Sequence, residues 1–209
     1  MGRAYSDIAF TPQVRAIQTQ KGSREQYARW DQMAERGDHL RRSEVEFIKR
    51  ADHFYQATVS ETGWPYVQHR GGPAGFLKVL DDKTLGFADF VGNVQYISVA
   101  NLSKDDRIAL IFVDYANQRR LKLMGRARTV EVADNPALAE SLRTPGYDAR
   151  IDRAVIIEVE AYDWNCPQHI TPRFTEEHIE MMTAPLHAQI KRLQEQVAQL
   201  TAARVRDQT

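Results

Sequence analysis

Short strand-like segments follow one another through the middle of the chain, and this succession constrains the fold more than any other feature of the sequence. Each segment is rich in β-branched, aromatic and aliphatic residues, and short turns join most of them. Consecutive strands with tight connections pair antiparallel. The expected strands cover residues 54–60, 64–69, 76–81, 84–90, 107–115, 119–132 and 153–164.

The segment 119–132 shows the pattern of a strand with two different faces. Leu121, Leu123, Gly125 and Ala127 alternate with basic residues and a methionine. Such a period of two places the small and apolar residues on the core side of a sheet. Closing the strands into a barrel removes exposed sheet edges. We therefore predict a mainly β fold, an antiparallel barrel with flanking helices.

Helices are expected on both sides of the strands. Residues 1–22 are interpreted as an irregular arm, followed by a helix over 23–37 that Ser23 caps and Gly37 ends. A second helix begins at Ser43, where Ser43 and Glu46 have the spacing of a capping box. Two short helices are predicted within the barrel, over 93–105 and 135–142, the latter with Pro136 in its first turn.

The tail is expected to form one long helix from residue 175 to about 204, bent or split at Pro185. From Leu186 to Leu200 its apolar residues follow the spacing of a coiled-coil heptad, although only about two heptads are regular. This stripe packs either on the barrel of its own chain or on a partner subunit. The sequence leaves both alternatives open.

Composition narrows the class of protein. The 209 residues include 28 basic and 28 acidic side chains, so the net charge is zero and a general nucleic-acid surface is not expected. No apolar run is long enough to span a membrane. The single cysteine, Cys166, is interpreted as a packed residue, and one cysteine suits a reducing compartment. We expect a cytoplasmic protein. The histidines lack metal-ligand spacing, so no metal site is expected.

An anion site is suggested by Arg70 and the glycines that follow it. Gly71 and Gly72 permit close backbone approach, and arginine offers a rigid fork of donors to phosphate oxygens. A glycine-rich bulge at a barrel corner explains the same residues without a ligand. Further donors are expected from the start of the helix near residue 93 and from one face of the strand 119–132. They are Asn93, Gln95, Ser98, Arg120 and Lys122.

The order of these segments resembles the pyridoxamine 5′-phosphate oxidase-like family of FMN-binding split barrels. The resemblance rests on "GWPYVQHRGG", "FLKVLD", "TLGFADFVGN", "RIALIFVDY" and "RRLKLMGRAR", within residues 43 to about 165. It is strongest with the broad branch of FMN-dependent proteins. The resemblance implies three parts: an N-terminal arm and helix over 1–42, an FMN-binding domain over 43–165 and a C-terminal segment over 166–209.

The same resemblance implies a homodimer with FMN at the subunit interface. Arg70 would lie beside the flavin phosphate and Arg120 would reach toward the flavin ring, while His69 could touch the flavin or a substrate. Lys78, Asp89 and Phe90 match positions near the cofactor. The full set of cofactor-binding candidates is His69, Arg70, Gly71, Gly72, Lys78, Asp89, Phe90, Asn93, Gln95, Ser98, Arg120 and Lys122.

The sequence also departs from the family pattern. Val94 and Gln95 stand where the pyridoxamine phosphate oxidases carry an arginine–lysine pair, and the loop after Arg70 is longer. Vitamin B6 phosphate is therefore not the expected substrate. The prediction is a flavin-dependent oxidoreductase acting on an unidentified small molecule. A flavin-binding or sensing dimer without turnover, or the same fold holding a deazaflavin or haem, remain alternatives.

Overall fold

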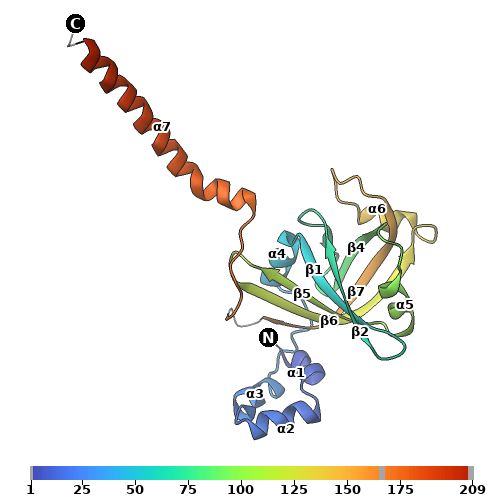
Figure 1. Ribbon diagram of the computed structural model, residues 1–209. Coiled ribbons are helices and arrows are strands. Elements are labelled where there is room, and N and C mark those ends of the chain that lie inside the picture. The colour runs from blue at the N-terminus through green and yellow to red at the C-terminus, as the bar shows by residue number, and fades with distance from the viewer. Residues whose placement is uncertain (1, 165–167, 207–209) are drawn as a thin grey trace. The chain divides into compact units, whose positions relative to one another are not determined.

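The structure is a computed structural model that describes residues 2–164 and 168–206 (Figure 1). Contacts divide the chain into two compact units. The larger consists of Met1–Asp114 and Gln118–Gln168, and the smaller of Tyr115–Asn117 and His169–Thr209. Cys166 lies outside the described residues, so its predicted packing is not described. Among the described residues, no helix is long and apolar enough to cross a membrane.

Seven antiparallel strands of the larger unit form one sheet, in the order β2-β1-β5-β6-β7-β4-β3 (Figure 1). The strand-like segments of the sequence therefore predicted the antiparallel fold correctly. The sheet is open, because β2 and β3 are its two edges. The strands are β1 (His53–Val59), β2 (Pro65–Gly71), β3 (Leu77–Val79), β4 (Thr84–Phe90), β5 (Arg107–Asp114), β6 (Arg119–Glu131) and β7 (Ile151–Trp164).

Although it is open, the sheet curls strongly. Phe54 on β1 lies 5.5 Å from Phe87 on β4 between ring centroids, although three strands separate β1 from β4 in the sheet. Phe54 also contacts Phe76 and Phe112. The core fills the inside of this curl with fully buried aromatic and aliphatic side chains, among them Phe54, Phe87, Leu121, Leu123 and Ile157.

The alternation predicted for the longest central segment is present in β6. Leu121, Leu123 and Ala127 are buried, whereas their neighbours along the strand are at least partly exposed. Gly125 continues the buried row at a register shift between β6 and β7. A Cβ at Gly125 would lie only 2.2 Å from the carbonyl oxygen of Glu158, so this close approach of the two strands requires glycine.

The prediction of an irregular N-terminal arm was wrong. The segment contains α1 (Arg3–Ala9) and α2 (Pro12–Gln20), followed by α3 (Arg24–Asp31). Thr11 accepts a hydrogen bond from the Val14 amide and Pro12 occupies the first turn, which is a favourable helix start. The helix expected over 23–37 ends at Asp31, well before Gly37.

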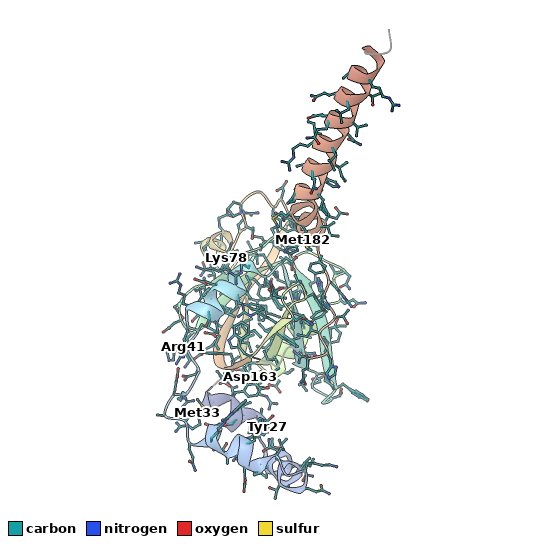
Figure 2. The ribbon with its side chains drawn as sticks, turned by 90° about the vertical axis from the view of Figure 1, so that its left-hand side faces the viewer. Tyr27, Met33, Arg41, Lys78, Asp163 and Met182 are labelled. Atoms are coloured by element: carbon teal, nitrogen blue, oxygen red, sulfur yellow. The ribbon has the colours of Figure 1, made fainter. Side chains whose placement is uncertain are left out.

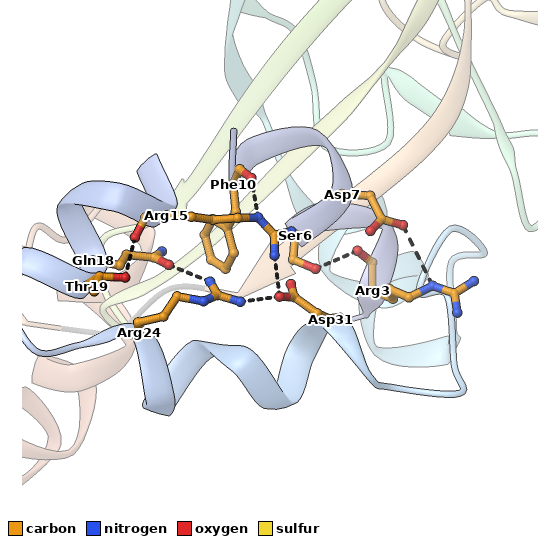
Figure 3. Close-up of polar contacts among 9 residues, drawn as sticks. All are labelled: Arg3, Ser6, Asp7, Phe10, Arg15, Gln18, Thr19, Arg24 and Asp31. Atoms are coloured by element: carbon orange, nitrogen blue, oxygen red, sulfur yellow. Dashed lines mark hydrogen bonds and ion pairs between the residues drawn. The ribbon is translucent and has the colours of Figure 1, made fainter. Parts of the chain in front are cut away.

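The Asp31 carboxylate links α3 to α2, and Arg15 extends this link to the end of α1. Asp31 pairs with both Arg15 and Arg24, and Arg15 also donates to the Phe10 carbonyl (Figure 3). Phe10 stacks on Trp30 at 5.8 Å between ring centroids. Helix α1 in turn packs on β7 through Ala4, Tyr5 and Ala161. Together these contacts make the N-terminal helices a folded part of the larger unit.

Helix α4 (Arg42–Arg50) begins one residue before Ser43, and its N-cap is Arg41 and not Ser43 as predicted. The Arg41 amide donates to the Glu44 side chain at 3.0 Å, while Glu46, expected to cap, instead pairs with Arg42. The spacing Arg41–Glu44 was overlooked because arginine is not a usual capping residue. The short helix α6 (Pro136–Ser141) has Asn135 as its N-cap. Pro136 lies in its first turn, as predicted.

The smaller unit consists mainly of α7 (Glu176–Arg206), which confirms the long helix expected at the C-terminus. Pro185 lies inside α7 and does not end it, and the first turns of the helix run in a different direction from the rest (Figure 1). Proline lacks the amide hydrogen that would bond to the Met181 carbonyl, so a change of direction is the expected effect.

Candidate functional site

A pocket of about 200 Å³ opens between β2, the end of β4, the start of β7 and the segment that leads into α5 (Ile97–Lys104). It contains half of the predicted cofactor-binding residues. These are Arg70, Asp89, Phe90, Asn93, Gln95 and Ser98. Tyr66, Gln68, Gly92, Val94, Tyr96, Ile97, Val99, Asp152 and Arg153 complete its lining.

An ion pair joins two walls of this pocket. Arg70 on β2 donates from Nη1 to Oδ1 of Asp89 on β4 at 2.6 Å, and their side chains are only 16% and 8% exposed. Burial raises the pKa of Asp89 above its usual range, even though the nearby charges of Arg70 and Arg153 act against that rise. The Nε of Arg70 is buried and has no hydrogen-bond partner among the described residues.

Arg153 is a second buried arginine of the pocket, and the sequence analysis missed it. It lies near the start of β7 with a side chain 7% exposed, donating to Glu131 at 3.1 Å and to Asp152 at 2.6 Å. Its guanidinium carbon lies 5.1 Å from the ring centroid of Tyr96. In the part of the chain that the structure describes, its buried Nη1 has no hydrogen-bond partner. Arg70 and Arg153 thus both retain donor capacity within one pocket.

The prediction that Asn93 caps α5 was wrong, because the helix starts later in the chain. Helix α5 begins at Ile97, and Asn93 instead accepts from the Gln95 amide at 3.2 Å. Val94 and Tyr96 have φ angles of 55° and 54°, in the left-handed region that interrupts a helix. Ser98, in the first turn of α5, is buried and donates to Gln68 at 2.9 Å. The helix N-terminus therefore does border the pocket, but through residues 96–99.

His69, Gly71 and Gly72 do not line the pocket. His69 points to the other face of β2, where its ring lies 5.7 Å from His53 and 5.5 Å from Tyr55. A Cβ at Gly72 would lie 2.9 Å from Phe76, and the Gly72 amide donates to the Asp52 carbonyl. The glycines after Arg70 thus allow this chain segment to pack closely on itself, as expected of a glycine-rich bulge, and their role at an anion site stays a prediction.

The predicted basic residues of β3 and β6 are also outside the pocket. Lys78 lies on β3 and Lys122 on β6, and Figure 2 shows Lys78 well away from Asp163, the partner of Lys122. Arg120 on β6 is half-buried, and its Nε has no hydrogen-bond partner among the described residues. The three cations therefore do not converge with Arg70 on one anion within a single chain.

Lys122 belongs to a separate polar cluster. Its Nζ donates to the Tyr5 hydroxyl at 2.6 Å and lies 3.1 Å from the Asp163 carboxylate. Burial opposes the charged form, but the bonds to Tyr5 and Asp163 outweigh it and raise the pKa of Lys122. This cluster fastens α1 to the sheet.

The sheet is open and antiparallel, and it curls until β2 meets β4 at an arginine-lined pocket. These features define a split-barrel protein. The family model described as pyridoxamine 5′-phosphate oxidase matches residues 40–164. The match covers more than half of the chain, which therefore belongs to this family. No curated protein sequence matches the chain.

Several solved structures are similar to the chain. HupZ of Group A Streptococcus is 18% identical, with a TM-score of 0.50, and the match covers 65% of this chain and 99% of that one. A Clostridium acetobutylicum protein of the pyridoxinephosphate oxidase family is 20% identical, with a TM-score of 0.43 and coverage of 64% and 92%. An FMN-binding protein from Syntrophomonas wolfei is 10% identical, with a TM-score of 0.45 and coverage of 71% and 97%.

Proposed function

We propose that the chain binds FMN, with the flavin phosphate in the pocket between Arg70 and Arg153, and that it is a flavin-dependent oxidoreductase acting on a small molecule other than vitamin B6 phosphate. Membership of the pyridoxamine 5′-phosphate oxidase family supports a flavin cofactor. Residues 43–165 would form the cofactor domain. The low cysteine content supports a cytoplasmic location.

The observation that carries this proposal is the unused donor capacity of two buried arginines. Nε of Arg70 and Nη1 of Arg153 are buried without partners among the described residues, and buried donors are normally satisfied. A phosphate presents several strong acceptors and two negative charges, which match such donors. Asp89 and Asp152 each accept from one arginine and thereby fix its orientation.

The start of α5 supplies a third element of the proposed phosphate site. The first amides of an α-helix have no partner within the helix and carry a partial positive charge. Ile97, Ser98 and Val99 line the pocket at this end. These amides compensate for Val94 and Gln95, which replace the basic pair of the pyridoxamine phosphate oxidases.

The volume of the pocket suits a part of FMN. Sites that enclose a whole cofactor-sized ligand measure roughly 300–1,000 Å³, whereas this pocket measures about 200 Å³. The phosphate and its chain would occupy the pocket, and the flavin ring would extend beyond it past Tyr66 or Tyr96. A second copy of the chain would cover the ring, in accordance with the homodimer implied by the family resemblance.

In this proposal the chain binds, orients and shields the cofactor. FMN, when bound, supplies hydride or single-electron transfer at its ring. Arg70 and Arg153 hold the phosphate, and Asp89 and Asp152 hold those arginines. Arg120 and Lys122 lie outside the pocket of their own chain, and in this proposal they would contact the flavin from the second copy.

The absorbance spectrum of the purified protein tests the proposal. Protein as purified, or after addition of FMN and gel filtration, is expected to show the flavin bands in a one-to-one ratio. Bleaching by NADH or NADPH, followed by reoxidation with an acceptor over many cycles, is expected of an oxidoreductase. Protein that retains no FMN, or that retains only a deazaflavin or haem, contradicts FMN binding. FMN that stays bound but never turns over contradicts the enzymatic part.

A further inference from the structure

Helix α7 carries a stripe of exposed apolar side chains. Leu186, Ile190, Leu193, Val197 and Leu200 recur at intervals of four, three, four and three residues. Each of them is between 51% and 71% exposed. A seven-residue repeat of this kind is the seam of a left-handed coiled coil, in which each seam residue fits between four residues of a facing helix.

The residue types in the seam specify the kind of coiled coil. Ile190 and Val197 occupy the a positions, and Leu186, Leu193 and Leu200 occupy the d positions. β-Branched residues at a with leucine at d favour two parallel helices over three or four. The stripe therefore indicates one partner helix that runs in the same direction.

The residues beside the seam indicate that the partner is the same helix of another copy. The e and g positions hold uncharged side chains, apart from a histidine, so two identical helices meet without like-charge repulsion. They are His187, Gln189, Gln194, Gln196, Thr201 and Ala203. A different partner is usually selected by charges at these positions. The charges of Lys191, Arg192 and Glu195 lie at b, c and f, away from the seam.

We propose that α7 forms a parallel, in-register, two-stranded coiled coil with α7 of a second copy of this chain, from Leu186 to Leu200. Pro185 takes a c position, outside the seam. Two heptads bind weakly alone, so the pairing rests on the homodimer proposed above, which would raise the local concentration of one helix around the other. The C-terminal helices would then strengthen a dimer whose main contact lies elsewhere.

Cysteine cross-linking in the full-length chain tests this pairing. In a Cys166→Ser background, Leu193→Cys and Leu200→Cys place single thiols in the seam, and Glu195→Cys and Ala202→Cys place matched thiols on the far side. A disulfide needs Cα atoms within about 7 Å. Identical seam positions of a parallel pair meet this requirement, and far-side positions do not.

Under mild oxidation, both seam variants are expected to form covalent dimers at least tenfold faster than both far-side variants. Adding Ile190→Lys and Val197→Lys should abolish the seam cross-link, whereas Ala188→Lys with Glu195→Lys should preserve it. In an antiparallel pair of identical helices, at most one residue lies opposite the same residue of the other copy. Cross-linking at only one of the two seam positions therefore overturns the proposal. Equal rates at seam and far-side positions, as for a stripe that packs on its own barrel, overturn it too.

The mass of the unoxidised protein by light scattering separates this inference from the proposed function. A dimer without seam cross-linking refutes the coiled coil and leaves the barrel dimer in place. A monomer that does not cross-link refutes both.

Discussion

Arg70 on β2 and Asp89 on β4 form a buried ion pair with an Nη1–Oδ1 distance of 2.6 Å, and so connect strands that lie five places apart in the sheet order. Hydrogen bonds between strands do not hold these two regions together. The pair therefore has two roles, fastening the curl of the sheet and holding Arg70 in the pocket. Its two roles are separable by mutation.

The binding role of the pair predicts a loss of FMN affinity. Arg70→Ala and Arg153→Ala should each weaken FMN binding by about 1.5–3 kcal/mol, since each removes charge-assisted hydrogen bonds to the phosphate. Fluorescence titration with FMN measures the effect. Arg107→Ala, which removes an exposed arginine paired with Asp105, serves as the control and should leave affinity unchanged. Equal affinity in the Arg70 variant and the control would remove Arg70 from the site.

The structural role of the pair predicts an asymmetry in stability. Arg70→Ala leaves Asp89 buried without its partner, so the free energy of unfolding should fall by about 3–5 kcal/mol. Arg70→Met combined with Asp89→Leu replaces both charges with apolar groups and should recover most of this loss. Urea unfolding measures stability, and FMN titration of the same double variant should still show weak binding. Restored FMN binding in the double variant would refute the phosphate role.

Asp89 also predicts how stability depends on pH. Its pKa is raised in the folded protein by burial, so the folded state binds a proton more tightly than the unfolded state. The stabilisation that this tighter proton binding gives is fully present below the pKa of Asp89 in the unfolded chain, about 3.9. It is lost as the pH rises through the pKa of Asp89 in the folded protein. Asp89→Asn should remove this loss, which urea unfolding at several pH values detects. Identical pH profiles for both proteins would contradict the raised pKa.

The N-terminal helices should respond to acid in the opposite direction. Burial opposes ionisation of Asp31, but hydrogen bonding and charge from Arg15 and Arg24 outweigh it, so its pKa is lowered. The stabilisation is present above the unfolded pKa of about 4 and is lost as the pH falls through the folded pKa. Trp30 fluorescence, taken as the difference from Trp30→Phe, reports this change. In the Asp31→Asn variant the Trp30 fluorescence should already differ from that of the unmodified protein at neutral pH. Unchanged fluorescence at neutral pH would show that Asp31 does not hold the N-terminal helices together.

The close approach of β6 and β7 predicts intolerance at Gly125. Gly125→Ala would place a Cβ 2.2 Å from the Glu158 carbonyl oxygen and should cost about 3 kcal/mol or more, at the upper end of overpacking effects. Gly92→Ala, whose Cβ would lie 4.0 Å from the Phe90 carbonyl oxygen, should change stability by less than about 0.5 kcal/mol. Thermal unfolding compares the two variants. Equal stability would mean that the strands separate easily at this point.

The sequence predicted the sheet because burial on one face imposes a period of two, as Leu121 and Leu123 show. The same period explains why His69 does not line the pocket, since it points away from the face that Arg70 occupies. The start of α5 was misplaced because the left-handed conformations of Val94 and Tyr96 have no signal in their residue types. Arg153 was missed because a charge near the start of a strand resembles a surface residue, and only the curl of the sheet encloses it.

The curl has a consequence for ligand binding. Arg70 and Arg153 belong to strands that become neighbours only when the whole sheet has folded. A ligand that contacts both arginines therefore binds only the folded sheet and stabilises its curl. The free energy of ligand binding at the pocket then adds to the free energy of unfolding of the entire domain. A rise in melting temperature that grows with ligand concentration would therefore identify the natural ligand, even among colourless compounds.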